Sequence, residues 1–303
     1  MIHKTEQKQE WAVASYALHD AYTDFILSRQ AMLCSPQTIR FYHFTAGRFI
    51  RYLQENSVTS PHETTARHIR AYLAELVEHR LSDSYIHGHA RAIRTLVRFW
   101  YKEKYIEKLI TFQMPAVSQK RQPVCSADEV RKIVSVCHTT RDKALVLLMV
   151  DTGLRRAEIC SLNWGDIDIS SGLVRVARGK GGKARSVVVG YKTRRALLAY
   201  RREIINHSDK DPVIQTIHGR RFTYNGLRSA LLRIGKRVDI HLSPHTLRRT
   251  FATLSLRAGM NLIQLQAILG HSSLEMTRKY IIMIDDDLLE AHRLHGPVDS
   301  FLK

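Results

Sequence analysis

Several features that identify common protein classes are missing from this 303-residue sequence. The four cysteines form no Cys-x-x-Cys pair and no cluster with other ligand residues, which argues against a zinc site and a disulfide framework. No segment approaches the roughly 20 consecutive apolar residues of a membrane helix, and no apolar signal segment follows the first residues. We therefore expect a soluble, cytoplasmic protein that has reduced thiols and no contact with a membrane.

Acidic residues are also few, with 28 Asp and Glu against 47 Lys and Arg, so the formal net charge is +19. A charge of this size exceeds what solubility requires, and a polyanion such as nucleic acid is the simplest partner. Residues 1–120 hold 16 Lys and Arg and 11 Asp and Glu, a net charge of +5, which leaves +14 for residues 121–303. Charge alone leaves open whether the chain is an enzyme or a non-enzymatic binder such as a ribosomal protein.

Residues 1–114 carry the pattern of a helical bundle. Apolar residues recur at helical spacing in four runs between residues 11 and 105. The second run opens with Ser35-Pro36, an N-cap residue followed by proline at the first helical position. The fourth run has an apolar side, and its other sides carry cations that we expect to bind DNA, among them Arg91, Arg94 and Arg98.

A second domain is predicted over residues 126–303, after an extended linker of residues 115–125 that contains two prolines and no periodicity. Its clearest β element is a hairpin, residues 173–178 and 184–189, around the turn Gly179-Lys-Gly-Gly-Lys183. A further short strand is expected at residues 213–217. Helices are expected elsewhere, over residues 192–206, 223–237, 245–257, 261–269, 273–282 and 286–294.

Four short segments of this second domain carry residue types that suit attack on a phosphodiester. They are Thr152-Gly-Leu-Arg155, His245-Thr-Leu-Arg248, Leu269-Gly-His271 and the lone Tyr280. Guanidinium groups bind phosphate oxygens in a bidentate way and keep their charge, and imidazoles donate hydrogen bonds or move protons near neutral pH. A phenol can form a covalent phosphoester. One His-x-x-Arg pair is weak evidence, and it is the joint occurrence of the segments that indicates a DNA strand-transferase.

These segments, in this order, resemble those of the tyrosine recombinases of the lambda-integrase and Xer type. That family has Thr-Gly-Leu-Arg-x-x-Glu, a Gly-Lys-Gly hairpin, His-x-Leu-Arg, Leu-Gly-His and a tyrosine nine residues later, and all of them occur here. The resemblance implies a mainly α protein. It implies an N-terminal four-helix, SAM-like core-binding domain and a mixed, mostly helical catalytic domain with a small antiparallel sheet, which together form a clamp around duplex DNA.

The resemblance also implies roles for individual residues. Arg155 and Arg248 would bind the scissile phosphate, and two fixed cations do suit a transition state that gathers negative charge. Tyr280 would attack the phosphorus and leave a 3′-phosphotyrosine and a free 5′-hydroxyl. His245 would help to remove the phenolic proton, since a phenol with a pKa near about 10 is mostly protonated at neutral pH. His271 would donate a hydrogen bond to the phosphate.

Three residues admit more than one interpretation. Lys180 resembles the lysine that protonates the departing 5′-oxygen, with Lys183 as the second choice. The alternative is that the cations of this hairpin form a solvated surface that only touches the DNA backbone; they are Arg178, Lys180, Lys183 and Arg185. Glu158 would orient a group of the active site, or it is an ordinary acid on a helix surface. Arg156, where the family commonly has a small or apolar residue, is a second phosphate contact or a surface charge.

The implied chemistry needs no metal, ATP or other cofactor, because the energy for rejoining is held in the phosphotyrosine bond. By resemblance, four subunits would assemble on two duplex DNA sites, and residues 286–301 would dock on the neighbouring subunit or fold back on their own domain. Two alternatives remain at this point. One is a nicking-closing enzyme similar to type IB topoisomerases, and the other is a DNA-binding protein without catalytic activity.

Overall fold

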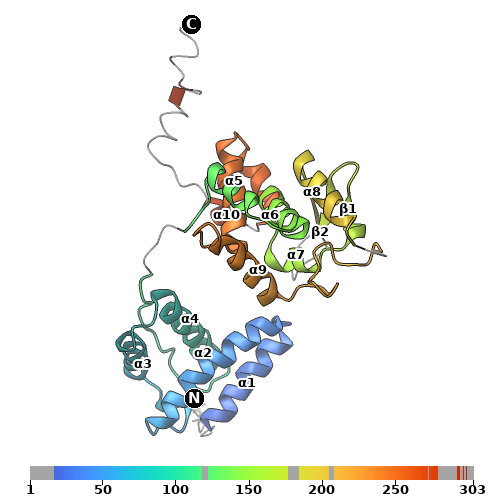
Figure 1. Cartoon of the computed structure of the whole chain (residues 1–303). Helices are drawn as coiled ribbons and strands as arrows, with labels where there is room; N and C mark the ends of the chain where they lie inside the picture. Colours follow the sequence, from blue (N-terminus) through green and yellow to red (C-terminus); the bar gives the residue numbers. More distant parts are fainter. Residues whose placement is uncertain are drawn as a thin grey trace, which may run out of the picture. The chain divides into compact units, whose positions relative to one another are not determined.

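The computed structural model describes residues 17–117, 122–176, 184–204, 208–271 and 273–278, together with 292, 293, 296 and 298 near the C-terminus. The chain divides into two compact units, residues 1–120 and 121–303. Figure 1 colours them along the sequence, with the helices of the first unit in blue to teal.

The N-terminal unit is a group of helices around an aromatic core. Ser35 begins the second helix as expected, since its side chain accepts a hydrogen bond from the Thr38 backbone N–H and Pro36 follows it. This helix packs against the first and the fourth helices, and Phe25, Phe49 and Trp100 are fully buried among them. The elements are α1 (Leu18–Ala31), α2 (Pro36–Glu55), the 3₁₀ turn η1 (Pro61–Glu63), α3 (Ala66–Glu78) and α4 (Asp83–Lys102).

The second unit is mostly helical and contains one small antiparallel sheet in the order β1-β2-β3. Strands β2 and β3 form the predicted hairpin, and Val176 pairs with Arg185 where the two strands leave the described residues. The strands are β1 (Ile167–Asp168), β2 (Leu173–Val176) and β3 (Arg185–Val188). The helices are α5 (Ala127–Ser135), α6 (Thr140–Thr152), α7 (Arg156–Ser161), the 3₁₀ turn η2 (Trp164–Asp166), α8 (Tyr191–Arg201), α9 (Tyr224–Lys236), α10 (Pro244–Arg257), α11 (Leu262–Leu269) and α12 (Leu274–Arg278).

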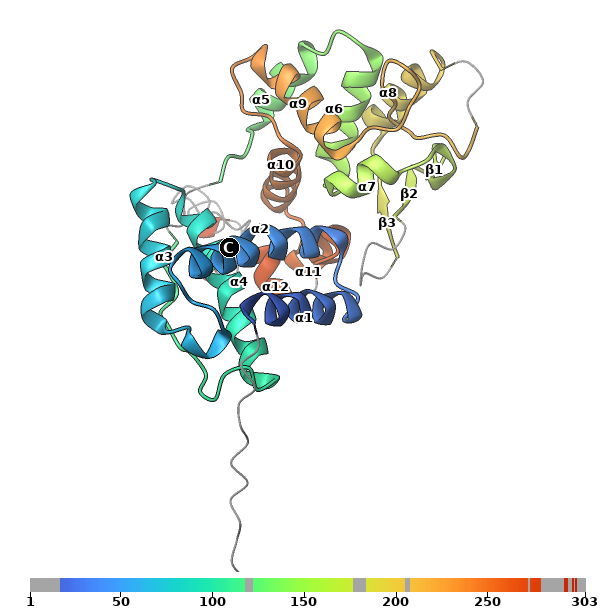
Figure 2. The same cartoon turned by 90° about the horizontal axis from the view of Figure 1, so that it is seen from below.

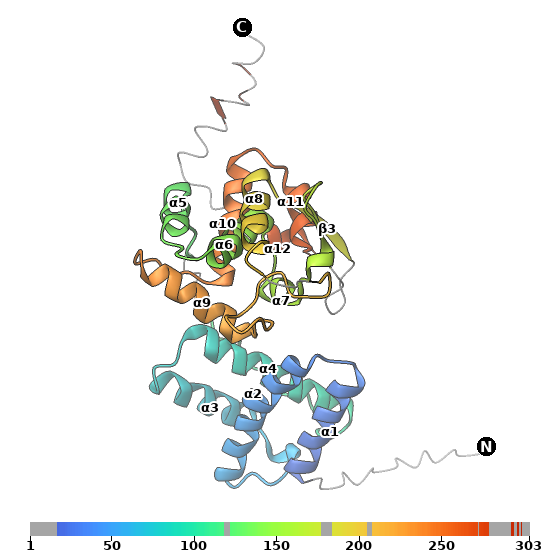
Figure 3. The ribbon, with the colours of Figure 1, turned by 45° about the vertical axis from the view of Figure 1, so that its right-hand side comes forward.

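Helix α6 runs through the core of this unit. It packs against α8 and α10, as Figure 2 and Figure 3 show, and Ala144, Leu145, Leu148 and Met149 are completely buried on it. Because α6 is enclosed, the turn that follows it is held on several sides. That turn contains Arg155.

The prediction of a strand at residues 213–217 is wrong. The structure describes these residues, and only an isolated bridge between Gln215 and Arg221 forms there. The backbone hydrogen bonds of this segment go elsewhere, from the Val213 N–H to the Leu162 carbonyl and from the Gln215 N–H to the Tyr200 hydroxyl. Val213 and Ile214 are therefore buried without belonging to a strand.

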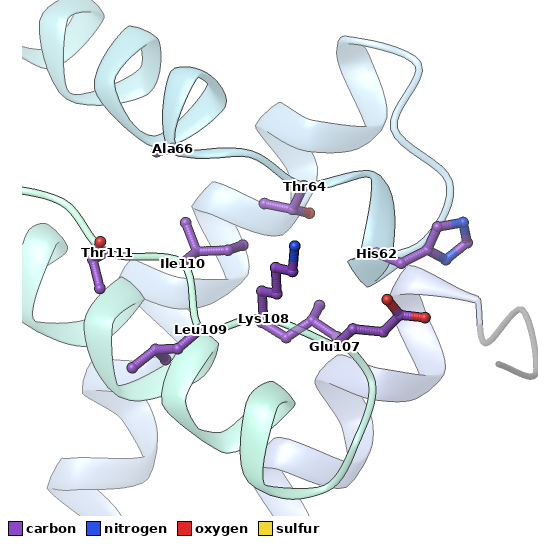
Figure 4. A pocket seen from close by; sticks show the side chains of 9 residues that line it. His62, Thr64, Ala66, Glu107, Lys108, Leu109, Ile110 and Thr111 are labelled. Atoms are coloured by element: carbon purple, nitrogen blue, oxygen red, sulfur yellow. The ribbon is translucent and has the colours of Figure 1, made fainter. Parts of the chain in front are cut away.

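A surface pocket of about 630 Å³ lies in the N-terminal unit, between the start of α3 and the segment that follows α4. Figure 4 shows the Lys108 side chain in the middle of this pocket and the Glu107 carboxylate directed toward His62. None of its lining residues belongs to the motifs identified above. The motif residues that suit attack on a phosphodiester belong to the second unit.

Candidate active site

The turn between α6 and α7 places Arg155. Gly153 ends α6 in the left-handed region, with φ +59°, and a Cβ at this position would lie 2.3 Å from the Phe251 ring and 3.0 Å from Leu269. Only glycine satisfies both requirements, because it has no Cβ and adopts positive φ without strain. Arg155 then stands as the N-cap of α7, and its backbone N–H donates to Glu158 Oε2 at 2.7 Å.

Arg248 reaches the same turn from α10. Its side chain is buried, with the residue 4% exposed, and it donates to the Gly153 carbonyl at 2.5 Å and to the Leu269 carbonyl at 2.8 Å. The same guanidinium lies 2.9 Å from His271 Nε2. One arginine thus holds together the ends of α6 and α11 and the histidine of the Leu-Gly-His segment.

The carboxyl end of α11 collects three arginines on three successive backbone carbonyls. Arg185 donates to the Ile268 carbonyl at 2.6 Å, Arg248 to that of Leu269 at 2.8 Å, and Arg155 to that of Gly270 at 2.9 Å. The last carbonyls of a helix lack partners within the helix and carry the negative end of its dipole. This helix end therefore suits a cluster of cations.

His271 is buried between Arg248 and Thr277, and its hydrogen bonds determine its tautomer. A guanidinium can only donate, so Nε2 accepts from Arg248, and Nδ1 carries the proton and donates to the Thr277 hydroxyl at 2.9 Å. Burial and the charges of Arg248, Arg155 and Arg185 lower the pKa of His271 to about 4. The imidazole is therefore neutral at pH 7.

His245 lies in the first turn of α10, after the Ser243 N-cap and Pro244. Its side chain is exposed at the surface of this unit. Partial burial of the ring and the nearby charges of Arg249, Arg156 and Arg248 lower the pKa of His245 below its usual value. A neutral, accessible imidazole can accept a proton at neutral pH.

Glu158 is not an exposed acid. Its side chain is 12% exposed, and its carboxylate contacts Arg155 and also Arg185, which donates to it from both terminal nitrogens at 2.7 and 2.9 Å. Burial raises the pKa of Glu158, but the hydrogen bonds and charges of Arg185 and Arg155 outweigh it and lower the pKa to about 2. Sequence reasoning missed Arg185, because no local pattern links it to a carboxylate 27 residues earlier.

The structure thus brings together Arg155, Glu158, Arg248 and His271. Among the arginines of this group, Arg248 also acts on the pKa of His245. The predicted residues Arg178, Lys180, Lys183 and Tyr280 lie outside the described residues. Among the described residues, no group of three His, Cys, Asp or Glu side chains is arranged to hold a metal ion. None of the described helices has the length and apolar composition needed to cross a bilayer.

The predicted DNA-binding arginines share one face of α4. Arg91 and Arg98 are exposed and Arg94 is half-buried. Their spacing of three and four residues places them along the same side of the helix. The Arg91 guanidinium also lies over the Phe41 ring of α2, 5.3 Å from its centroid. Arg156, in the second unit, similarly lies 5.2 Å from the centroid of the Tyr224 ring.

Comparison with known proteins accounts for both units. The phage integrase family matches residues 123–285, and the phage integrase N-terminal SAM-like domain matches residues 22–107. Tyrosine recombinase XerC of Oceanobacillus iheyensis is 31% identical over 278 residues, which are 87% of this chain and 91% of that protein. Tyrosine recombinase XerA of Saccharolobus solfataricus is 29% identical over 276 residues, 89% of this chain and 90% of the relative.

A solved structure shows the same fold. The Tn1549 transposon integrase, in complex with a circular intermediate DNA, superposes with a TM-score of 0.75 at 19% identity, over 92% of this chain and all of that chain. The expected fold class, mainly α with an N-terminal SAM-like domain and a small antiparallel sheet, is confirmed. The topoisomerase-like and catalytically silent alternatives are not favoured, because the relatives are named tyrosine recombinases. The chain belongs to the phage integrase family and is a tyrosine recombinase.

Proposed function

We propose that this protein is a site-specific DNA recombinase that cleaves and rejoins duplex DNA through a phosphotyrosine bond to Tyr280. The observation that carries the proposal is the convergence of Arg155, Arg248 and His271 on the carboxyl end of α11. The relatives are named tyrosine recombinases, and the Tn1549 integrase was solved with DNA. We place the protein in the cytoplasm, with the DNA on which it acts.

In the proposed reaction, Arg155 and Arg248 stabilise the charge that builds on the phosphate in the transition state. The Arg155 side chain is 39% exposed, so it can turn N–H groups toward a bound phosphate while the Gly270 carbonyl and Glu158 hold it in place. Arg248 is buried and fixes the position of His271. Both cations are therefore in place before DNA binds, and little reorganisation is needed during the reaction.

The proton transfers follow from the states of the side chains. His245, kept neutral by partial burial of its ring and by its arginine neighbours, takes the proton of the Tyr280 hydroxyl. The phenolic oxygen then forms a bond to phosphorus, the bond to the 5′-oxygen breaks, and Lys180 gives that oxygen a proton. Lys183 is the alternative donor. Rejoining is the reverse reaction with the 5′-hydroxyl of another strand, so neither ATP nor a metal ion takes part.

His271 has two successive tasks in this scheme. Without DNA, its Nε2 accepts from Arg248 and orients that guanidinium. A bound phosphate brings negative charge that favours protonation of the ring, and the protonated Nε2 can then donate to a phosphate oxygen. Glu158 acts on the phosphate only through Arg155.

A covalent adduct tests the proposal. A duplex obtained by selecting a random-sequence library with the wild-type protein is nicked near the cleavage position, so that the cleaved strand diffuses away and the adduct accumulates. Digestion should yield a phosphotyrosine peptide that contains Tyr280, and Tyr280→Phe should bind the duplex without forming an adduct. An adduct at Tyr224 or Tyr191 would overturn the assignment, and no adduct with wild type would overturn the proposed function.

We further propose that four subunits act on two DNA sites and that residues 286–301 dock on a neighbouring subunit. All but a few of these residues lie outside the described part of the chain. Truncation after Asp285 should preserve binding to a single site and abolish the slower complex of paired sites on a native gel. Normal pairing and recombination by the truncated protein would show that the segment folds back on its own domain.

A further inference from the structure

Arg185 is held inside the second unit by its own side-chain hydrogen bonds. It is the first residue of β3, and its side chain is only 14% exposed. Its two terminal nitrogens donate to the two carboxylate oxygens of Glu158 at 2.7 and 2.9 Å, and its Nε donates to the Ile268 carbonyl at 2.6 Å. A buried guanidinium with this bidentate geometry is a fixed element of the unit and not a flexible contact to DNA.

Glu158 is shared between two arginines. Oε1 accepts from the Arg155 side chain at 3.1 Å as well as from Arg185, and Oε2 also accepts from the Arg155 backbone N–H at 2.7 Å. If Arg155 were the only partner, the carboxylate would neutralise the cation that is meant for the phosphate. With Arg185 present, the three side chains keep one net positive charge. Arg185 therefore compensates Glu158 and leaves the charge of Arg155 effective.

A second path from Arg185 to Arg155 runs through Gly270. Gly270 ends α11 with φ +63°, and a Cβ on it would lie 3.2 to 3.3 Å from three atoms of the Arg185 side chain. The guanidinium group of Arg185 is thus packed on the residue whose carbonyl accepts from Arg155 at 2.9 Å. A shift of Arg185 would move both supports of Arg155, the carboxylate and the carbonyl.

We propose that Arg185 is a positioning residue for DNA cleavage, which holds Glu158 and the end of α11 so that Arg155 keeps both its place and its charge for the phosphate. This inference rests on the proposed function. The simpler possibility is that Arg185 only stabilises the packing of β3 on α11. The positioning role and the packing role predict different results when the charge of Glu158 is removed from a variant that lacks Arg185. Only the positioning role predicts that the cleavage rate then partly recovers.

The test uses the full-length protein, the selected duplex and single-turnover cleavage at saturating DNA. Arg185→Gln should cleave about 100-fold more slowly, as expected for a catalytic group displaced by about 1 Å. The matched control is Arg175→Gln, which removes an exposed cation from the neighbouring strand β2. It should cleave at the wild-type rate. The affinity for DNA should be the same in the two variants.

The double variant Arg185→Gln/Glu158→Gln is the decisive comparison. In this variant the amide at position 158 still accepts a hydrogen bond from Arg155 but carries no charge. Cleavage should therefore be about tenfold faster than with Arg185→Gln alone. Thermal unfolding of all variants shows whether rates follow stability instead. If Arg185→Gln is too unstable to purify, Arg185→Lys, which keeps the charge without the bidentate geometry, should give an intermediate rate.

Two outcomes would overturn the inference. One is cleavage by Arg185→Gln as fast as by Arg175→Gln. The other is a double variant no faster than Arg185→Gln, which would leave Arg185 as a packing residue. Failure of the proposed function is distinguishable from both, because the wild-type protein would then form no adduct at Tyr280.

Discussion

The two units of this protein each bury a histidine, and the two histidines share several properties. His89 in the N-terminal unit and His271 in the second unit are 1% and 9% exposed, and the pKa of each is lowered to about 4. Each has Nδ1 at 2.9 Å from a hydroxyl, that of Tyr72 for His89 and that of Thr277 for His271. Burial of the ring is the largest cause of both shifts.

The surroundings of the two rings differ. His89 lies among aromatic side chains, with the Tyr85 ring centroid at 4.5 Å, and a single arginine, Arg48, contributes to its shift. Three arginines act on His271, and these also contact the end of α11. A buried histidine with a lowered pKa therefore does not identify an active site. The convergence of three arginines near His271 is what supports the proposed active site there, and the following changes test that distinction.

The largest effect is expected from removing the arginine beside each histidine. Arg248→Ala should reduce single-turnover cleavage by about 10³- to 10⁵-fold, the range found for transition-state arginines. Arg48→Ala, its counterpart beside His89, should cleave at the wild-type rate when DNA is saturating. Equal losses of affinity and rate in Arg248→Ala would instead make Arg248 an anchor for DNA. Arg248→Lys separates charge from hydrogen-bond geometry.

The next effect concerns the pH dependence of cleavage. A general base contributes about 10²- to 10⁴-fold, so His245→Gln should lose activity within that range. Because partial burial of the ring and then the neighbouring arginines lower the pKa of His245, wild-type cleavage should stay constant as the pH falls below 6.5 and decline only when the ring becomes protonated. Arg156→Gln removes one of those neighbours, so its decline should begin at higher pH. If the pH dependence of cleavage by Arg156→Gln were identical to that of the wild type, Arg156 would be excluded as a cause of the lowered pKa of His245.

A smaller effect is expected on stability. Both histidines titrate near 6.5 when unfolded and near 4 when folded, so the unfolded chain binds more protons between these values and stability falls as the pH is lowered through them. The free energy of unfolding should fall by about 2 kcal/mol for each histidine between pH 7 and pH 5. His89→Asn and His271→Asn should each remove one such contribution, measured by urea unfolding followed by circular dichroism. If a variant lost stability with falling pH as steeply as the wild type, the lowered pKa of that histidine would be contradicted.

The smallest effect compares two glycines. At Gly88 in α4 a Cβ would make ordinary contact with Phe41 at 3.8 Å, so Gly88→Ala should stabilise the protein by about 0.5 to 1 kcal/mol through helix propensity. Gly270→Ala should destabilise by about 1 kcal/mol or more, because φ is +63° and Arg185 is in the way. Thermal unfolding measures both. Cleavage should fall only for Gly270→Ala.

Much of the fold could be predicted because its signals are local. Ser35, Ser126 and Ser243 each cap a helix through a hydrogen bond to a residue three positions later, and such spacing can be read from the sequence. The false strand at residues 213–217 shows the limit. Its apolar residues indicate burial, but the partner of each backbone N–H is set by residues distant in sequence, such as Tyr200.

The candidate site shows the same division. The family motifs identified Arg155, Arg248, His245 and His271, and the structure brings them into one neighbourhood. The roles assigned to them remain predictions. Arg185 was grouped with the solvated hairpin cations, because its burial depends on Glu158 and on the end of α11, neither of which is near it in sequence.

The anchoring of the arginines on α11 bears on how such an enzyme can diversify. The groups that accept from Arg185, Arg248 and Arg155 on this helix are main-chain carbonyls, which every amino acid provides. Exposed side chains along α11 can therefore change by mutation without loss of these arginine contacts, provided that the helix still ends at Gly270. Substitutions at the exposed positions of this helix, such as Ile263, should therefore leave the three arginine contacts intact.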